Sequence, residues 1–347
     1  MWNPLRQKNK IYNLGIDIGT SSIKLVELLH DGNNIKLNNY AQFFPKSDYI
    51  DNSSGSLNLL DFQIAEALKN MFSETDFASG KAVLGLPVFS SFSTLIELPA
   101  MSDAELKDAI GYEVRKYIPV PISEVQFDWT KIEALSDENK FKVLTVAVPN
   151  EIIEKYNRIA QMVNINLTTM ELETFSSARA LVSQSSQENI AILDLGYRTT
   201  NVSIISGGIV IIHHNVDAGG SGITRGLAQA MSVDLQRAEE IKKTSGVSAT
   251  ENNVSGILKN YIDKILMEAE QVFQNYIQEG GKKITRIILT GGGALMPGFA
   301  DYVKEVFSVE TEIANPFKAI EVPSQLKRKL EKESPGFAVA VGLALRK

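Results

Sequence analysis

Cysteine is absent from the 347-residue chain, and histidine occurs only three times. Without thiols the chain can form no disulfide, no thiolate metal site and no cysteine nucleophile, which fits a reducing compartment. His213 and His214 are neighbours in a predicted strand, where adjacent side chains point to opposite faces and cannot bind one ion together. We therefore expect one of these two side chains to be buried and the other to be exposed.

The chain also lacks an excess of positive charge and long apolar runs. The formal net charge is -6, which disfavours a general nucleic-acid surface. No segment approaches the roughly 20 apolar residues needed to span a bilayer. The basic N-terminal residues MWNPLRQKNK lack the apolar stretch of a secretory signal. Because the length exceeds a usual single core of about 100–200 residues, we expect two lobes.

The first part of the chain predicts strands mixed with one helix. Residues 11–29 are typical of two strands joined by a glycine turn, and residues 81–87 of a buried strand. Between them, four apolar residues recur at helical spacing: Phe62, Ala65, Leu68 and Phe72. This pattern indicates a lobe built around a sheet.

Residues 91–165 predict a small inserted subdomain with a β-α-β-β-α order. Its helix begins with a capping box, Ser102 and Glu105. The apolar stripe of that helix consists of Leu106, Ile110, Val114 and Tyr117. Alternating strands are expected at 91–98, 125–132 and 141–148, followed by a helix at 150–162.

The second half of the chain repeats the first. After a strand and helix at 166–182 and the polar break SQSSQ, residues 189–212 again predict strand, glycine turn and strand. A mainly helical region follows, with one long apolar face: Leu258, Ile262, Ile265, Ala269, Val272 and Tyr276. A strand at 286–290, a helix at 299–307 and the small-residue helix FAVAVGLAL complete two duplicated lobes.

Two similar segments predict a phosphate and magnesium site: DIGTSSIK from Asp17 and DLGYRTTN from Asp194. In each, a glycine, Gly19 or Gly196, lets the backbone turn beside a phosphate. The candidate phosphate donors that follow are Thr20, Ser21, Ser22, Lys24, Thr199, Thr200 and Asn201. One such turn alone is also typical of hairpins. A repeated pair favours two aspartates that face each other and hold Mg²⁺ mainly through its waters.

A third glycine turn, GGGALMPG, follows a predicted strand and precedes a helix. Glycines there let the backbone approach a ring or a ribose phosphate, and the helix N-terminus adds a favourable dipole. The residues expected to contact the nucleotide are Gly291, Gly292, Gly293 and Met296. The segment has neither the GxGxxG spacing of a dinucleotide fold nor the GK[ST] of a P-loop.

These three motifs, in this order and over nearly the whole chain, resemble those of the actin, sugar-kinase and heat-shock-chaperone superfamily. The resemblance implies an α/β, actin-like (ribonuclease H-like, duplicated) two-lobed fold that binds ATP and Mg²⁺. The first lobe is implied to comprise residues 1–90, 166–187 and 333–347, with an insertion of the FtsA 1C type at 91–165. The second lobe is implied to comprise residues 188–223 and 284–332, with a helical subdomain at 224–283.

The same resemblance assigns further roles. Gly219 and Gly220 are similar to the turn after the second phosphate motif. Glu239 is expected to meet ribose hydroxyls, and Lys242 the base edge; without the resemblance they are a solvated helix pair. Glu173 stands where the superfamily places the residue that orients an attacking water. The alternative is a glutamate that interacts with its helix dipole.

Within the superfamily, the chain resembles the type IV pilus assembly protein PilM family. The similar phrases are LGIDIGTSSIKLVEL and residues 84–91, 97–102 and 113–119. The resemblance implies a cytoplasmic ATP-binding scaffold, recruited to the inner face of the cytoplasmic membrane, with slow or absent hydrolysis. The implied partners are the N-terminal cytoplasmic tail of PilN, other pilus assembly proteins and a second copy of the chain. The alternative is an FtsA-like cytoskeletal ATPase or another actin-fold ATPase or kinase; FtsA is expected to end in an amphipathic membrane helix, which this sequence lacks.

An extended partner peptide is expected between the first lobe and the insertion. The insertion and the residues before it contain more aromatic side chains than the core of a small subdomain can bury, so some of them are expected to contact the peptide. The candidates are Phe89, Phe92, Tyr112, Tyr117, Phe127 and Trp129. Aromatic anchors would supply the binding energy, and backbone pairing with a sheet edge would set the register.

Overall fold

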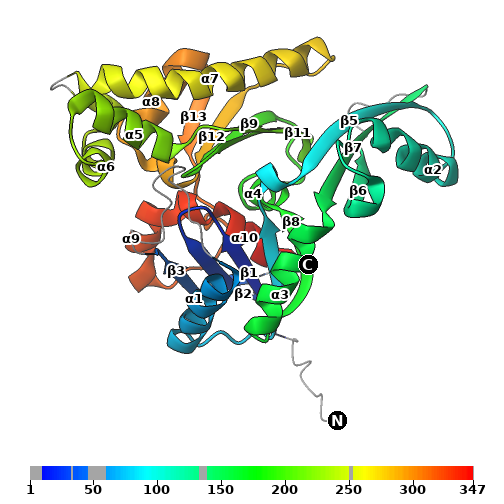
Figure 1. Cartoon of the computed structure of the whole chain (residues 1–347), viewed down its shortest axis with the longest axis horizontal. Coiled ribbons are helices and arrows are strands. Elements are labelled where there is room, and N and C mark those ends of the chain that lie inside the picture. Colours follow the sequence, from blue (N-terminus) through cyan, green and yellow to red (C-terminus); the bar gives the residue numbers. More distant parts are fainter. Residues whose placement is uncertain (1–9, 33, 46–59, 133–138, 250–252, 347) are drawn as a thin grey trace, which may run out of the picture.

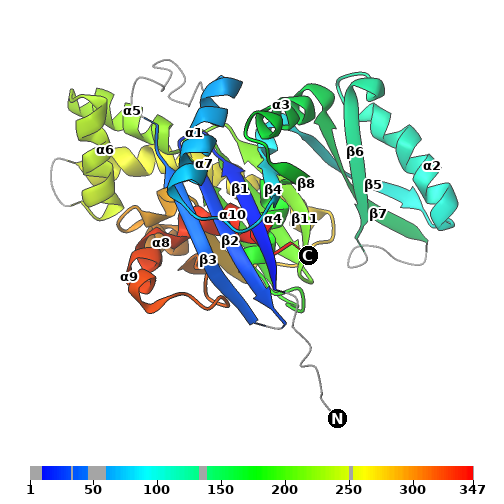
Figure 2. The same cartoon turned by 90° about the horizontal axis from the view of Figure 1, so that it is seen from below.

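Two five-stranded sheets with the same strand order form the centre of the protein (Figures 1 and 2). The computed structural model describes residues 10–32, 34–45, 60–132, 139–249 and 253–346. The first sheet has the order β3-β2-β1-β4-β8. Its strands are β1 (Ile11–Ile18), β2 (Ile23–Asp31), β3 (Asn34–Phe43), β4 (Lys81–Leu86) and β8 (Asn166–Leu172).

The second sheet repeats this topology with the order β11-β10-β9-β12-β13. Its strands are β9 (Asn189–Leu195), β10 (Thr200–Ser206), β11 (Ile209–Val216), β12 (Arg286–Thr290) and β13 (Glu310–Ile313). In both sheets three antiparallel strands are followed by two strands parallel to the first. The predicted duplication is therefore confirmed, although the pattern analysis missed the outer strands β3 and β13.

Helices cover the sheets and fill the junction between them. In the first lobe, α1 (Asp61–Glu74) and α3 (Asn150–Met162) pack on one face of the sheet. The junction holds α4 (Glu173–Leu181) and α10 (Ala338–Ala344), which contact each other closely. The remaining helices belong to the second lobe and to the loop after it: α5 (Gly220–Met231), α6 (Leu235–Thr244), α7 (Val254–Gln278), α8 (Phe299–Phe307) and α9 (Ser324–Glu333). The predicted apolar face of α7 is buried along its whole length.

A third, three-stranded sheet with the order β5-β7-β6 lies to one side of the lobes (Figure 1). We call it the inserted sheet. Its strands are β5 (Phe92–Pro99), β6 (Val125–Lys131) and β7 (Lys140–Pro149), and helix α2 (Asp103–Glu113) packs with them. The predicted capping box is present, because Ser102 accepts from the Glu105 backbone N–H and Glu105 accepts from the Ser102 backbone N–H.

Two expectations for this region need correction. Tyr117 is 50% exposed, because α2 ends at Glu113 and a 3₁₀ turn carries Tyr117 off the buried stripe. Helix α3 was expected within the insertion, yet it packs on α1, and its buried residues Tyr156 and Ile159 belong to the core of the first lobe. We therefore propose that the insertion ends near the end of β7.

Close backbone packing at α10 yields a first prediction. A Cβ at Gly342 would overlap the carbonyl oxygen of Ser176 in α4, so Gly342→Ala should lower the free energy of unfolding by about 1–3 kcal/mol. The matched control is Gly222→Ala in α5, where a Cβ meets no atom within 4 Å and helix propensity favours alanine by up to about 1 kcal/mol. Chemical denaturation measures both variants. Equal stability of the two would contradict the packing described at α10.

Candidate functional site

Three carboxylates from different elements come together at the junction of the lobes. Asp17 and Asp194 occupy equivalent positions near the ends of β1 and β9. Their partners across the hairpins, Lys24 and Asn201, are equivalent as well. Glu173, the first residue of α4, is close enough for both aspartates to raise its pKa. The duplication thus delivers one aspartate from each lobe to the same place.

This cluster carries more negative charge than it can neutralise. Burial raises the pKa of Asp17, although Lys24 lies 3.4 Å away and acts against the shift. Burial, reinforced by Asp17, raises the pKa of Asp194 to about 6. Burial, with Asp17 and Asp194 adding to it, raises the pKa of Glu173 well above its ordinary value. One lysine cannot balance three carboxylates, so the site favours a cation.

The carboxylate oxygens of Asp17 and Asp194 are donors of the kind that a divalent cation such as Mg²⁺ prefers. Within the described ranges, no group of three His, Cys, Asp or Glu side chains is placed to hold a metal ion. Mg²⁺ gives up its waters reluctantly and binds proteins through few direct carboxylates. The chemistry of Asp17 and Asp194 would therefore suit a hydrated Mg²⁺.

The two aspartate turns have the same backbone geometry. The Gly19 N–H donates to the Ser22 carbonyl at 3.0 Å, and the Gly196 N–H donates to the Thr199 carbonyl at 3.0 Å. Thr20 and Ser21 lie at the partly exposed tip of the first turn. Their hydroxyls remain the candidate phosphate donors of this turn, whereas Ser22 is 3% exposed.

The second turn uses its side chains differently from the prediction. The Thr200 hydroxyl is buried and donates to the Ala218 carbonyl at 2.7 Å. The Asn201 side-chain oxygen accepts from the Asn215 amide at 2.7 Å. The expectation that Thr200 donates its hydroxyl proton to phosphate is therefore wrong, because the hydroxyl already donates that proton to the Ala218 carbonyl. Backbone N–H groups of the turn are the better candidates.

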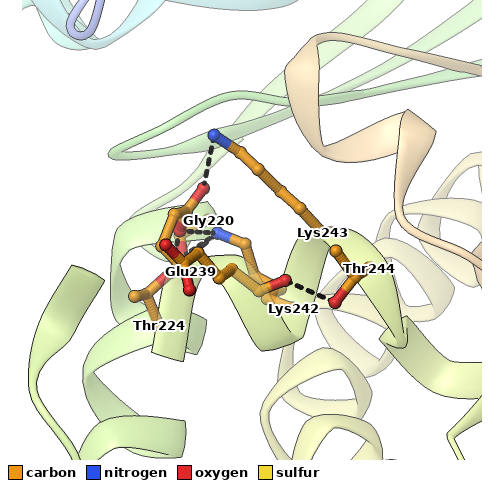
Figure 3. A network of polar contacts seen from close by, with 7 residues as sticks. Gly220, Thr224, Glu239, Lys242, Lys243 and Thr244 are labelled. Atoms are coloured by element: carbon orange, nitrogen blue, oxygen red, sulfur yellow. Dashed lines mark hydrogen bonds and ion pairs between the residues drawn. The ribbon is translucent and has the colours of Figure 1, made fainter. Parts of the chain in front are cut away.

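Residues assigned to the nucleoside form a connected polar network between α5 and α6 (Figure 3). Lys242 is 7% exposed, and its Nζ donates to the Gly220 carbonyl at 3.0 Å and to the Thr224 hydroxyl at 2.7 Å. Glu239 pairs with Lys242 at 2.6 Å and accepts from Thr224 at 2.5 Å. Burial alone would raise the pKa of Glu239, but the Lys242 ammonium lowers it.

The network changes the interpretation of the Glu239–Lys242 pair. It is not the solvated helix pair that the spacing alone predicted, because Lys242 is buried and burial lowers its pKa. Gly219 is the N-cap of α5, the helix that carries Gly220 and Thr224. The side chain of Glu239 keeps 27% of its surface exposed, so it can meet a ribose, whereas Lys242 must first leave Gly220 to reach a base.

The third glycine turn lies against the carboxylate cluster. Gly291 has a φ of 80°, and a Cβ there would overlap a carboxylate oxygen of Asp194. Gly292 faces open space, while Gly293 packs on Leu195. The expectation for Met296 is wrong: its side chain is 6% exposed and lies in the hydrophobic core of the second lobe. The turn therefore offers backbone, not the methionine side chain, to a ligand.

The six aromatic residues predicted for a partner peptide do not form one surface. Tyr112, Phe127 and Trp129 line a hollow of about 650 Å³ between α2 and β6. Phe92 packs in the core under α2. Tyr117 is exposed but outside the lining of the hollow. The insertion alone lines the hollow, so it is a different place from the expected site between the first lobe and the insertion, which stays a prediction.

Two contacts of the site were missed by the sequence analysis. The guanidinium of Arg198, in the second aspartate turn, lies 5.2 Å from the ring centroid of Phe89. The backbone N–H of Val88 lies near the Glu173 carboxylate and lowers its pKa, against the larger effect of burial. The DLGYRTTN motif contains Arg198, but nothing in the sequence indicates that its partner is an aromatic residue from the other half of the chain.

Duplicated sheets of this order, with an aspartate turn from each lobe at their junction, define a protein of the actin-like ATPase fold. The chain belongs to the family of the type IV pilus assembly protein PilM, whose family model matches residues 15–347.

Solved structures and curated relatives agree with this fold. A structure of a PilM-PilN type IV pilus biogenesis complex has 23% sequence identity and a TM-score of 0.81, covering 96% of this chain and 98% of that one. The ethanolamine utilization protein EutJ from Carboxydothermus hydrogenoformans has 17% identity and a TM-score of 0.59, covering 99% and 91%. The cell division protein FtsA of Staphylococcus epidermidis is 21% identical over 88% of this chain and 74% of its own length. In the described part of the chain, no helix is long and apolar enough to cross a membrane.

The raised pKa of Asp194 yields a second prediction. Its pKa rises from 3.8 to about 6 in the folded state, so ionisation of Asp194 destabilises the ligand-free fold. The stability that the protonated Asp194 carboxyl contributes is fully present below pH 3.8, and it is lost as the pH rises through about 6. Asp194→Asn should therefore increase the free energy of unfolding by about 1–3 kcal/mol at pH 7.5, and by far less near pH 4.

Denaturation of the ligand-free protein between pH 4 and pH 8 measures this dependence. Asp217→Asn is the matched control, because it makes the same substitution at a side chain that is 82% exposed and that pairs, within the described residues, only with the exposed Arg198 at 3.9 Å. A gain for Asp194→Asn that is the same at every pH would rule out ionisation as its cause.

Proposed function

We propose that this chain is an ATP-binding scaffold of the type IV pilus assembly machinery that binds the N-terminal cytoplasmic tail of PilN. Membership of the PilM family carries the proposal. Two separate features of the molecule give it a physical basis: the carboxylate cluster at the lobe junction and the aromatic hollow on the insertion. The proposed place of action is the inner face of the cytoplasmic membrane, with other pilus assembly proteins and a second copy of the chain as further partners.

The lobe junction has the chemistry of a Mg-ATP site. Asp17 and Asp194 would hold the waters of Mg²⁺, and the cation would neutralise both the carboxylates and the phosphates. The backbone at Gly292 would approach the phosphates closely, because no side chain intervenes, while the Gly19 and Gly196 N–H groups already close their turns. Among proteins of similar fold, MreB5 of Spiroplasma citri has been solved with ADP, at a TM-score of 0.52 and 13% identity.

Glu173 is proposed to orient water near the phosphates, with slow turnover. Burial, which raises its pKa, disfavours the charged carboxylate that would accept a proton from water. Neither histidine of β11 belongs to the cluster, since His213 contacts Ser93 and His214 contacts Glu268. A scaffold requires occupancy of the site rather than turnover, in contrast to an FtsA-like ATPase or a kinase.

The aromatic hollow is the proposed site for the PilN tail. It lies beside β6, which is an edge strand of the inserted sheet, and an edge strand can pair with an added extended peptide. Tyr112 is 69% exposed and faces the hollow together with Trp129. Lys107, Asp108, Arg115 and Asp128 place charges of both signs around these rings, which would fix the orientation of a charged peptide.

Peptide titration against variants tests this assignment. We expect Tyr112→Ala and Trp129→Ala each to weaken binding of a synthetic PilN-tail peptide about tenfold or more, as for aromatic anchors of an interface. Calorimetry gives the affinities, and circular dichroism shows that each variant is folded. Tyr117→Ala is the matched control, since Tyr117 is an exposed tyrosine of the same subdomain outside the hollow. Wild-type affinity in both test variants, or an equal loss in the control, would remove the hollow from consideration.

A further inference from the structure

The inserted sheet is covered on both of its faces. Val143 and Ala147 of its central strand, β7, belong to the small core beneath α2. Because successive side chains of a strand point to opposite faces, Leu144, Val146 and Val148 point to the other face, which we call the back face. Leu144 is 4% exposed and Val148 is 7% exposed, so other parts of the chain cover the back face as well.

The two ends of the back face pack on different lobes. Leu144 belongs to the hydrophobic core of the second lobe, as does Ile132, which follows β6 and is fully buried. Val148 belongs to the core of the first lobe, and Val146 packs against that same core. Side chains of one short strand therefore enter the cores of both lobes.

Two polar contacts strengthen the attachment to the second lobe. Strands β5 and β11 lie side by side (Figure 1), and His213 of β11 forms a hydrogen bond with the Ser93 hydroxyl of β5. Lys142, at the start of the back face, donates to the Glu279 carbonyl beyond the end of α7 at 3.2 Å. The inserted sheet is thus attached to the second lobe through both apolar contacts and hydrogen bonds.

The chain itself attaches the inserted sheet to the first lobe. The 3₁₀ turn Val88–Ser90, which we call the connecting segment, joins β4 to β5, and α3 follows β7 directly. Helix α3 packs on α1 and β8 of the first lobe. Because both ends of the insertion are fixed there, the inserted sheet moves with the first lobe. A change in the angle between the lobes must then break the contacts of Leu144, Ile132 and His213 with the second lobe.

We propose that the inserted sheet is a brace across the junction of the lobes, which limits how far the two lobes separate in the ligand-free protein. Separation would expose Leu144 and Ile132 to water, and the loss of buried apolar surface opposes it. The brace follows from the contacts of the insertion alone, so it does not rest on the proposed function. It keeps Asp17 and Asp194 near each other before any ligand binds.

Distances between the lobes in solution test the brace directly. Because the chain contains no cysteine, Glu66→Cys in α1 and Gln236→Cys in α6 place one spin label on each lobe without further changes. Both side chains are exposed. Pulsed electron paramagnetic resonance should give one narrow distance distribution for this pair. Adding Leu144→Ala should produce a second population at longer distance, because the cavity weakens the contact with the second lobe.

Leu98→Ala is the matched control. Leu98 of β5 is 8% exposed and belongs to the core beneath α2, so this variant loses the same side-chain atoms from the inserted sheet without altering its contact with the second lobe. It should keep the narrow distribution. Circular dichroism checks that each variant is folded. If Leu144→Ala fails to fold, Ile132→Val removes a single methylene and should produce a smaller second population.

The dissociation rate of Mg-ATP gives a second readout. We expect Leu144→Ala to release a fluorescent ATP analogue about fivefold faster or more than the wild type, whereas Leu98→Ala should release it at the wild-type rate. If no nucleotide binds the wild type, the proposed function fails, and the distance measurement still decides the brace.

Three results of the distance measurement would refute the brace. The first is an unchanged distribution in the folded Leu144→Ala or Ile132→Val variant. The second is a wild type that already shows the longer distance in a large population. The third is a broadening in Leu98→Ala equal to that in Leu144→Ala, because it would reflect general loosening of the insertion.

Discussion

Burial of three neighbouring carboxyl groups, those of Asp17, Glu173 and Asp194, is the constraint on which the rest of the structure depends. Three elements bring these carboxylates together against a single neighbouring ammonium, that of Lys24. Such an arrangement is costly in the ligand-free protein, and the surrounding packing must hold it. The close contact of α10 with α4 fixes the helix that begins at Glu173, and the two equivalent sheets fix the aspartates. The free energy of unfolding of the ligand-free protein is thus lowered at the place where a cation would balance the carboxylate charge.

The chain leaves the first lobe for the insertion beside the carboxylate cluster. Because the connecting segment starts at the carboxylate cluster, the subdomain with the hollow is attached to the site rather than to a distant surface. The Arg198 guanidinium lies over the Phe89 ring, so the connecting segment also contacts the second aspartate turn.

Local signals in the sequence predicted much of the fold. The capping box of α2, the apolar face of α7 and the two aspartate turns depend on neighbouring residues, so their patterns are visible without a structure. The strands β3 and β13 are largely polar, and pairing with β2 and β12 decides their conformation. Thr200, Met296 and Tyr117 were misjudged because their surroundings come from other parts of the chain. The contact of Arg198 with Phe89 was invisible for the same reason.

Proton release on nucleotide binding measures the charge balance of the cluster directly. A cation bound beside Asp194 lowers the pKa of a carboxyl that otherwise titrates at about 6. Calorimetric titration of the wild type with Mg-ATP at pH 6, in two buffers of different ionisation enthalpy, gives the number of protons released. We expect Mg-dependent binding with net release of protons. Binding without proton release, or binding that is unchanged when Mg²⁺ is chelated, would contradict a cation held between Asp17 and Asp194.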